Sequence, residues 1–124
     1  DVGVFQSINK RIADKVTCAD LMTFSGLQFA HASTGDGSDY TATVNDDIIS
    51  ADTNDSALTV TLPSAGAIAG KVYIIKDVGG NAGTNAISIE TEGSENIDGS
   101  SSASISTNDS EMRLYSDGSN FYSF

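Results

Sequence analysis

Residues 40–124 alternate small runs of apolar and polar side chains with short turns rich in Gly, Asn and Asp. Residues 57–62 show the pattern most clearly, because Leu58, Val60 and Leu62 alternate with two threonines. Such a period of two indicates β-strands that are buried on one face. Turn residues recur about every 8–12 positions, which is typical of a β-sandwich or a small barrel.

We predict about eight strands in this part of the chain, arranged as an antiparallel β-sandwich or a small jelly roll. Pro63 ends one strand, since proline cannot donate to a ladder, and Asp117-Gly118 predicts a tight hairpin. The expected strands are residues 40–44, 47–51, 57–62, 71–77, 86–91, 102–107, 111–116 and 120–124, with the second joined to the first at Asn45-Asp46. The expected core consists of Ile48, Leu58, Val60, Leu62, Val72, Ile74, Ile87, Ile89, Ile105 and Leu114.

The chain divides into an N-terminal arm of residues 1–30, a flexible linker of residues 31–39 and the β-module of residues 40–124. The linker is rich in Gly, Ser and Asp, which is typical of flexible segments. Apolar residues of the arm recur every four positions, so we expect the arm to be partly helical. They can cover either the core of the same chain or a neighbouring protein, and the intervening linker favours the second. The stripe consists of Val4, Ile8, Ile12 and Val16.

The formal net charge is −11, from 6 basic and 17 acidic residues. Three of the six basic residues, Lys10, Arg11 and Lys15, lie in the arm, so the module is strongly acidic. An acidic surface repels phosphate backbones, and we therefore expect no nucleic-acid partner. No apolar run approaches the roughly 18–20 residues of a membrane span, so we expect no membrane partner. Cys18 is the single cysteine, which excludes a disulfide within the chain.

Few side chains in this sequence are suited to catalysis, and we expect no catalytic residues, no metal and no cofactor. His31 is the only histidine and lies in the expected linker, so no Ser-His-Asp or Cys-His arrangement is available without it. The acidic segments 45–47 and 52–55 could ligate calcium, but neither matches a complete calcium loop. Turn formation explains them equally well. The glutamates of residues 90–95 are better explained as charges that protect a strand edge.

The order of motifs in residues 40–124 resembles the terminal β-module of bacteriophage structural proteins, namely tail fibres, head fibres and capsid decoration proteins. Members of this family often carry Trp where this chain has Phe121. The resemblance implies a trimeric, non-enzymatic component of the virion, located on the outer surface of the phage particle. The motifs that carry it are Leu58-Thr59-Val60-Thr61-Leu62-Pro63, Gly70-Lys71-Val72-Tyr73-Ile74-Ile75-Lys76-Asp77, Ala86-Ile87-Ser88-Ile89, Ile97-Asp98-Gly99 and Leu114-Tyr115-Ser116-Asp117-Gly118-Ser119-Asn120-Phe121-Tyr122.

We therefore expect a capsid decoration or head-fibre protein whose arm docks on the major capsid protein or another virion protein, while a homotrimer of β-modules projects outward. The alternative is the receptor-binding tip of a tail fibre, with Tyr115 and Tyr122 facing a host glycan. A carbohydrate-binding accessory domain is a third class. The expected partner-binding residues of the arm are Val4, Phe5, Ile8, Lys10, Arg11, Ile12, Lys15 and Val16.

Overall fold

The computed structural model describes residues 25–64 and 69–124, and this part of the chain contains β-strands and no helix. The expected helical stripe of Val4, Ile8, Ile12 and Val16 lies outside the described residues. No helix within the described ranges is long and apolar enough to cross a membrane.

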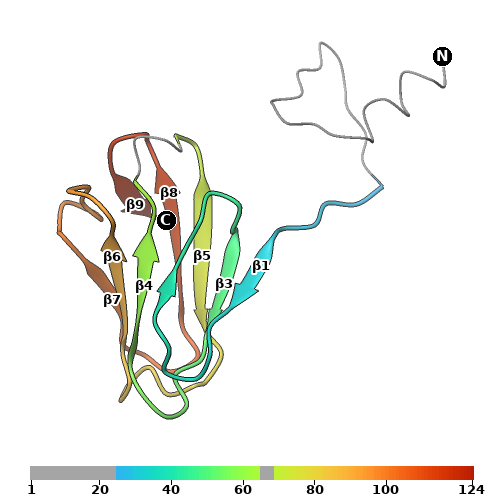
Figure 1. Ribbon diagram of the computed structural model, residues 1–124, viewed down its shortest axis with the longest axis vertical. Helices are drawn as coiled ribbons and strands as arrows, with labels where there is room; N and C mark the ends of the chain where they lie inside the picture. Colours follow the sequence, from blue (N-terminus) through green and yellow to red (C-terminus); the bar gives the residue numbers. More distant parts are fainter. Residues whose placement is uncertain (1–24, 65–68) are drawn as a thin grey trace.

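The strands form two sheets that face each other (Figure 1). Sheet A contains β1 (His31–Ser33), β3 (Ile48–Ala51), β5 (Val72–Asp77), β8 (Glu111–Ser116) and β9 (Phe121–Ser123) in that order, and sheet B contains β2 (Tyr40–Thr41), β4 (Leu58–Leu62), β6 (Ile87–Thr91) and β7 (Ala103–Ile105).

The chain crosses from one sheet to the other after each of the first five strands, so the strands that become neighbours run parallel. Parallel pairs join β1 to β3, β3 to β5, β2 to β4 and β4 to β6. The pairs β5–β8, β6–β7 and β8–β9 are antiparallel. The predicted all-β, two-layered class is confirmed, whereas the predicted antiparallel pairing is wrong for this first half.

The turn at Asn45-Asp46 shows why the pairing was mispredicted. The N–H of Asp46 donates to the carbonyl of Thr43 at 3.2 Å, and its carboxylate accepts from the backbone N–H of Thr43 at 2.8 Å, so the turn is closed in both directions. The turn nevertheless carries the chain from β2 in sheet B to β3 in sheet A, so the two expected neighbours do not pair. A turn residue marks where a strand ends, but it does not select the strand with which the next one pairs.

The core lies between the two sheets. On sheet B it consists of the predicted side chains, since Val60, Leu62, Ile87 and Ile89 are fully buried and Leu58 is nearly so. On sheet A the predicted Leu114 is fully buried, but on β3 and β5 the large buried side chains are Ile49, Tyr73 and Ile75, and the expected Ile48, Val72 and Ile74 face outward. Both faces of β3 and β5 are apolar, so a period of two cannot say which face is buried.

Tyr73 shows how the inward face of β5 tolerates a phenol. Its ring is fully buried, while its hydroxyl donates to the backbone carbonyl of Thr43 at 2.9 Å. Phe121 from β9 lies against it, with ring centroids 6.3 Å apart. The pair fills the core beneath β5 and β9.

The hairpin between β8 and β9 confirms the prediction from Asp117-Gly118. Gly118 adopts a positive φ of 94°, a conformation that costs glycine little. The Asp117 carboxylate accepts hydrogen bonds from the backbone N–H groups of Ser119 and Asn120, both at 2.7 Å. The turn then returns the chain so that Tyr122 lies opposite Tyr115.

Residues 31–39, predicted to be a flexible linker, belong partly to sheet A. His31–Ser33 form β1, and the next residue, Thr34, donates its N–H to the carbonyl of Ser50 at 2.9 Å. Gly37 donates its N–H to the carbonyl of Asp52 at 2.9 Å. Backbone groups pair whatever the side chains are, so a segment of small polar residues can join a sheet without showing any alternation.

Candidate binding surface

The outer face of sheet A carries exposed and half-buried apolar and aromatic side chains from four neighbouring strands. Val72 lies opposite Tyr115, which lies opposite Tyr122, so these three form a row across β5, β8 and β9. Ile48, Ile74 and Arg113 form a second row. We call this surface the sheet A face, and its residues are Ile48, Val72, Ile74, Arg113, Tyr115, Tyr122 and Phe124.

Among the three aromatic rings of this face, that of Tyr115 contacts the other two. The rings of Tyr115 and Tyr122 stack with centroids 5.4 Å apart and an interplanar angle of 29°. Phe124 meets Tyr115 edge-on at 6.1 Å, and the guanidinium of Arg113 lies 5.6 Å from the centre of the Phe124 ring. Tyr115 remains 41 % exposed and Phe124 59 % exposed. The cluster therefore exposes aromatic surface and the Arg113 guanidinium to solvent.

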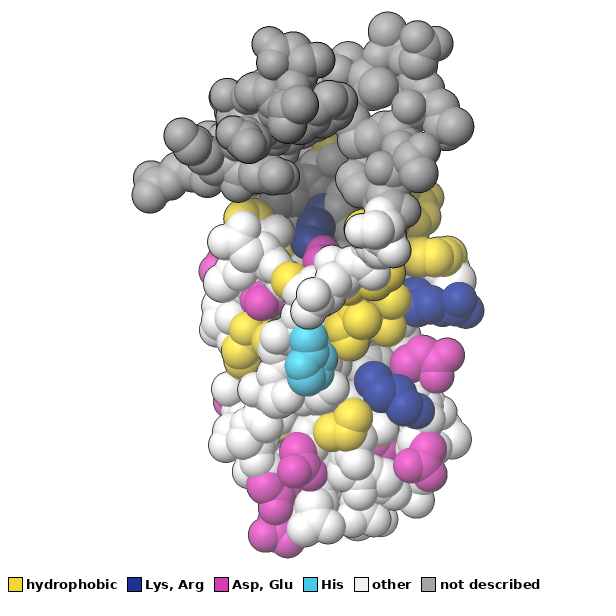
Figure 2. Space-filling view, turned by 90° about the vertical axis from the view of Figure 1, so that its right-hand side faces the viewer, with side chains coloured by type: hydrophobic (Ala, Val, Ile, Leu, Met, Phe, Trp, Pro, Cys, Tyr) yellow, Lys and Arg dark blue, Asp and Glu magenta, His cyan; other side chains and the backbone are white. Residues whose placement is uncertain are grey.

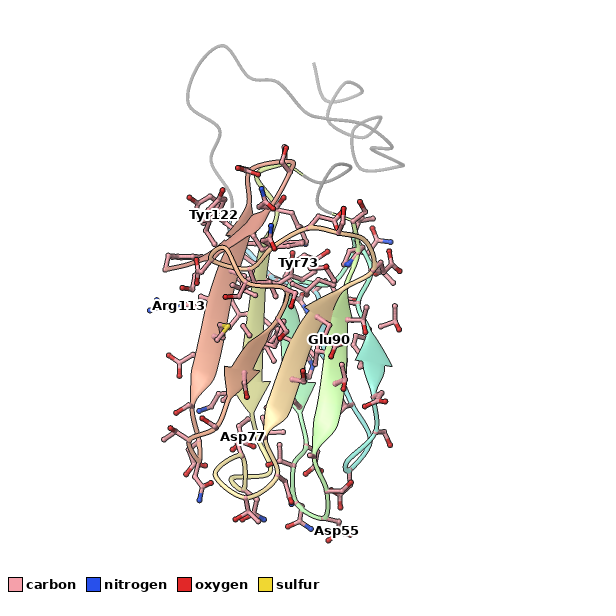
Figure 3. All side chains as sticks on the ribbon, turned by 90° about the vertical axis from the view of Figure 1, so that its left-hand side faces the viewer. Asp55, Tyr73, Asp77, Glu90, Arg113 and Tyr122 are labelled. Atoms are coloured by element: carbon pink, nitrogen blue, oxygen red, sulfur yellow. The ribbon has the colours of Figure 1, made fainter. Side chains whose placement is uncertain are left out.

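The carboxylate of Asp117 beside Tyr122 raises the pKa of that phenol above its usual value. The hydroxyl of Tyr122 therefore keeps its proton at neutral pH and remains able to donate a hydrogen bond. Figure 3 shows Tyr122 and Arg113 projecting from the same side of the sandwich, whereas Tyr73 lies between the layers.

Sheet B has an outer face of opposite character. Thr59 lies opposite Ser88, which lies opposite Ser104. Thr61 pairs with Thr41 on one side and with Glu90 on the other. Hydroxyl groups and one carboxylate thus cover this sheet, and small hydroxyl side chains are well solvated by water. The difference between the two faces indicates that the sheet A face is the one suited to being covered.

The basic residues of the described ranges, Lys71, Lys76 and Arg113, also belong to sheet A or its border. Lys76 donates to the backbone carbonyl of Asp109, and Lys71 forms an ion pair with Asp47. Figure 2 shows dark blue Lys and Arg side chains bordering the yellow hydrophobic ones, with the single histidine beside them. This face thus combines apolar surface with basic side chains, and the acidic Glu111 lies opposite Lys76.

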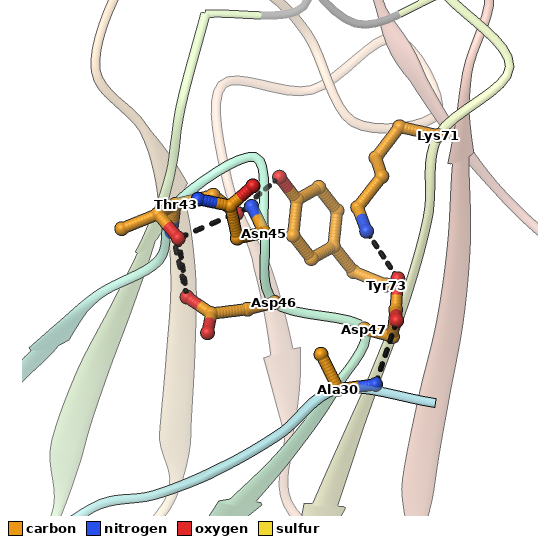
Figure 4. Close-up of polar contacts among 7 residues, drawn as sticks. All are labelled: Ala30, Thr43, Asn45, Asp46, Asp47, Lys71 and Tyr73. Carbon is orange, nitrogen blue, oxygen red and sulfur yellow. Dashed lines mark hydrogen bonds and ion pairs between the residues drawn. The ribbon is translucent and has the colours of Figure 1, made fainter. Parts of the chain in front are cut away.

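The acidic segment 45–47 is used within the fold (Figure 4). Asp46 accepts hydrogen bonds from the hydroxyls of Tyr40 and Thr43, both at 3.0 Å. Burial alone would raise the pKa of Asp46, but these bonds and that from the Thr43 N–H lower it below the usual value. Asp47 accepts from Lys71 and from the N–H of Ala30. The bond from Lys71 contributes most to lowering the pKa of Asp47.

The acidic segment 52–55 likewise forms turns. Asp52 accepts a hydrogen bond from the N–H of Asn54 at 3.1 Å. Hydrogen bonding and repulsion by Asp36 raise the pKa of Asp55. Across residues 25–64 and 69–124, no three His, Cys, Asp or Glu side chains converge as metal ligands would. The turn interpretation accounts for both acidic segments.

A polar hollow of about 300 Å³ lies at one end of sheet B. Its carboxylates come from Glu90, on the outer face of β6, and from Glu95, which accepts a hydrogen bond from the Ser64 hydroxyl at 2.5 Å. The remaining lining residues carry hydroxyl, amide or no side-chain groups: Thr91, Gly93, Ser94, Asn96, Ser101 and Ser102.

Of the predicted site residues, the structure describes only Tyr115 and Tyr122. It brings Tyr115 and Tyr122 together, as a glycan-facing or packing pair requires. The arm residues Val4, Phe5, Ile8, Lys10, Arg11, Ile12, Lys15 and Val16 lie outside the described residues. Sequence reasoning did not assign Ile48, Val72 and Ile74 to the surface, because their apolar character favoured the core. The sequence did contain one sign of this outcome. Tyr73 and Ile75 alternate with Val72 and Ile74 and are also large and apolar, so either pair could have been the buried one.

A comparison with models of known protein families gave no match. No curated protein matched the chain significantly either.

Proposed function

We propose that this chain is a non-enzymatic structural protein of a phage particle, a capsid decoration or head-fibre protein that self-assembles as a homotrimer on the outer surface of the capsid. The observation that carries the proposal is the difference in polarity between the outer faces of the two sheets. Sheet B is covered by hydroxyls, whereas sheet A exposes Val72, Tyr115 and Phe124. Contiguous exposed apolar surface marks interaction sites. The assignment to a virion is supported by the resemblance of residues 40–124 to phage terminal modules.

In this proposal the arm attaches the assembly to the particle. Val4, Phe5, Ile8, Ile12 and Val16 supply apolar contacts to the major capsid protein. Lys10, Arg11 and Lys15 supply three of the chain's six basic side chains, whereas the module is strongly acidic. An arm that binds the assembled capsid, but not its separated subunits, stabilises the particle by mass action.

Co-sedimentation with capsids that lack this protein tests the proposal. We expect the full chain to sediment with capsids and a chain without residues 1–24 to stay in the supernatant. The shortened chain retains Ala30 and therefore the contacts that hold β1. Equal binding by both chains, with equal thermal unfolding, would reject the arm as the anchor. Native mass spectrometry of the full chain, without capsids, tests the trimer.

The alternative function is that of a receptor-binding fibre tip, and the exposed aromatic cluster favours it. Aromatic rings stack on sugars, and Arg113 beside Phe124 suits an acidic sugar. This alternative predicts binding on a glycan array, with binding reduced by Tyr115→Ala and by Tyr122→Ala. An array without any bound glycan counts against it.

A further inference from the structure

Residues 25–30 precede β1 as a segment whose side chains are all exposed, and we call this segment the strap. It runs away from the sandwich (Figure 1). Among the described residues, none forms a hydrogen bond with the backbone of residues 25–29. The two large apolar side chains of the strap also lie in solvent, since Leu27 is 76 % exposed and Phe29 54 % exposed. The strap is therefore an exposed stretch of backbone with which no described residue pairs before Ala30.

The backbone is held in place from Ala30 onward. The N–H of Ala30 donates to the Asp47 carboxylate at 2.8 Å. The Ala30 carbonyl accepts from the N–H groups of Asp47 and Ile48 at 3.1 and 2.9 Å. The next residues form β1, which pairs with β3 along its whole length. Ala30 therefore marks the boundary between accessible backbone and backbone that belongs to the sandwich.

The loops within the sandwich differ from the strap, because their backbones take part in hydrogen bonds. In the loop between β5 and β6, Thr84 donates its N–H to the carbonyl of Asn81 at 2.9 Å. Val78, in the same loop, has a side chain as exposed as that of Phe29, at 54 %. Its N–H, however, donates to the carbonyl of Ala51 at 2.9 Å. The strap combines exposed apolar side chains with a backbone that is free to be bound.

Such a combination suits an endopeptidase, which binds its substrate in an extended form through main-chain hydrogen bonds and through pockets for the side chains. A backbone that is already paired must first open locally, and this opening costs free energy. We propose that the strap is a processing site, where an endopeptidase with an apolar S1 pocket cuts between Leu27 and Gln28. The inference goes beyond the proposed function and does not depend on it, because the cut requires only the free chain.

The boundary at Ala30 selects this bond over the bond between Phe29 and Ala30, since a peptidase holds its substrate on both sides of the bond that it cuts. After Leu27 the next two residues belong to the strap, whereas after Phe29 the next residues are Ala30 and β1. Hydrolysis breaks the bond between the Leu27 carbonyl carbon and the Gln28 nitrogen; water gives its hydroxyl to the carbon and its proton to the nitrogen. The product, residues 28–124, keeps Ala30 and the hydrogen bonds that hold β1.

Limited proteolysis of the full-length chain with chymotrypsin tests the inference, because the hydrophobic S1 pocket of this enzyme accepts both leucine and phenylalanine. We expect a product of residues 28–124 to accumulate, identified by its intact mass, with the melting temperature of the full chain. A synthetic peptide of residues 25–33 is the matched control. It lacks the partners of Ala30 and should therefore also be cut after Phe29. Leu27→Ser should slow formation of the product at least about 10-fold, since the S1 pocket loses its apolar occupant.

Val78→Leu is the control for exposure alone. It places a leucine at a position that is as exposed as Phe29 but whose backbone is hydrogen-bonded, and it should add no cut after residue 78. A new cut there would show that exposure suffices and that the free backbone of the strap has no special role.

Other outcomes would overturn the inference as well: a product that begins at Ala30, cuts within the strands of the sandwich, or a strap that stays intact while the control peptide is cut. Each of these leaves capsid binding by the arm untouched. Chymotrypsin treatment of capsids that carry the full chain separates the two proposals in the other direction. If the strap is cut and the module stays on the capsid, the processing site stands and the arm is rejected as the anchor.

Discussion

Asp77 is 1 % exposed, and its carboxylate accepts four hydrogen bonds. They come from the Thr53 hydroxyl at 2.7 Å and from the N–H groups of Gly80, Ala82 and Asp109 at 3.0, 3.1 and 3.0 Å. Burial alone would raise the pKa of Asp77, but these bonds lower it below the usual value. One carboxylate thus joins the end of β5 to three separate loops.

Asp77→Asn should lower the free energy of unfolding by about 2–4 kcal/mol, because the new amide group places N–H donors against N–H donors. Urea denaturation measures the change. Glu92→Gln, an exposed carboxylate changed to an amide, is the control and should have little effect. Equal stability of both variants would show that the hydrogen bonds at Asp77 contribute nothing net.

The pH dependence of this contribution has a definite sign. The folded-state pKa of Asp77 lies below the value of about 3.9 expected in the unfolded chain, so the folded state binds this proton less tightly. The stabilisation is complete above that unfolded value and is lost as the pH falls through the folded pKa. We expect the free energy of unfolding of Asp77→Asn to decrease less steeply than that of wild type as the pH falls. Some decrease remains in the variant, because the pKa values of Asp46 and Asp47 are also lowered.

At the scale of elements, the loop between β5 and β6 packs closely against the loop between β3 and β4. Gly79 makes this approach possible, since a Cβ at this position would lie 2.4 Å from the backbone nitrogen of Thr53 and 2.6 Å from that of Asn54. Backbone atoms cannot give way as a flexible side chain can. The two loops therefore need a glycine at their point of contact.

Gly79→Ala should destabilise the fold by about 2–3 kcal/mol through overpacking, which for a domain of this size lowers the melting temperature by about 10 °C. Gly26→Ala is the matched control, because a Cβ there meets nothing within 4 Å. Thermal unfolding followed by circular dichroism measures both. A melting temperature unchanged by Gly79→Ala would contradict the close packing of the two loops.

At the scale of the whole molecule, a net charge of −11 opposes the proposed self-assembly at long range, while the exposed surface of the sheet A face that favours it is apolar and acts only at contact. Raising the salt concentration from about 0.1 M to about 1 M shortens the Debye length from about 10 Å to about 3 Å. We expect association to tighten over this range in sedimentation velocity. Weaker association at high salt would mean that attraction between opposite charges holds the copies together.

The C-terminal aromatic residues show how far a sequence can lead toward the site. Tyr115, Phe121, Tyr122 and Phe124 lie close together in the sequence, which gives no reason to divide them between the core and the surface. The structure divides them. Phe121 is buried against Tyr73, and the other three lie outside. Alternation predicts that Phe121 and Tyr122 point to opposite faces, but not which face the other strands bury.

The sequence by itself determined the approximate position of most strands, the tight turn at Asp117-Gly118, and the buried face of sheet B, because Leu58, Val60 and Leu62 alternate with threonines that favour water. Only the tertiary structure decided which strands pair and which face of β3 and β5 is buried. Pairing depends on where the chain goes after a turn, and local residues do not record this. Where Val72 and Ile74 compete with Tyr73 and Ile75, both faces are apolar. The outcome then depends on distant partners, such as the carbonyl of Thr43 that accepts the Tyr73 hydroxyl.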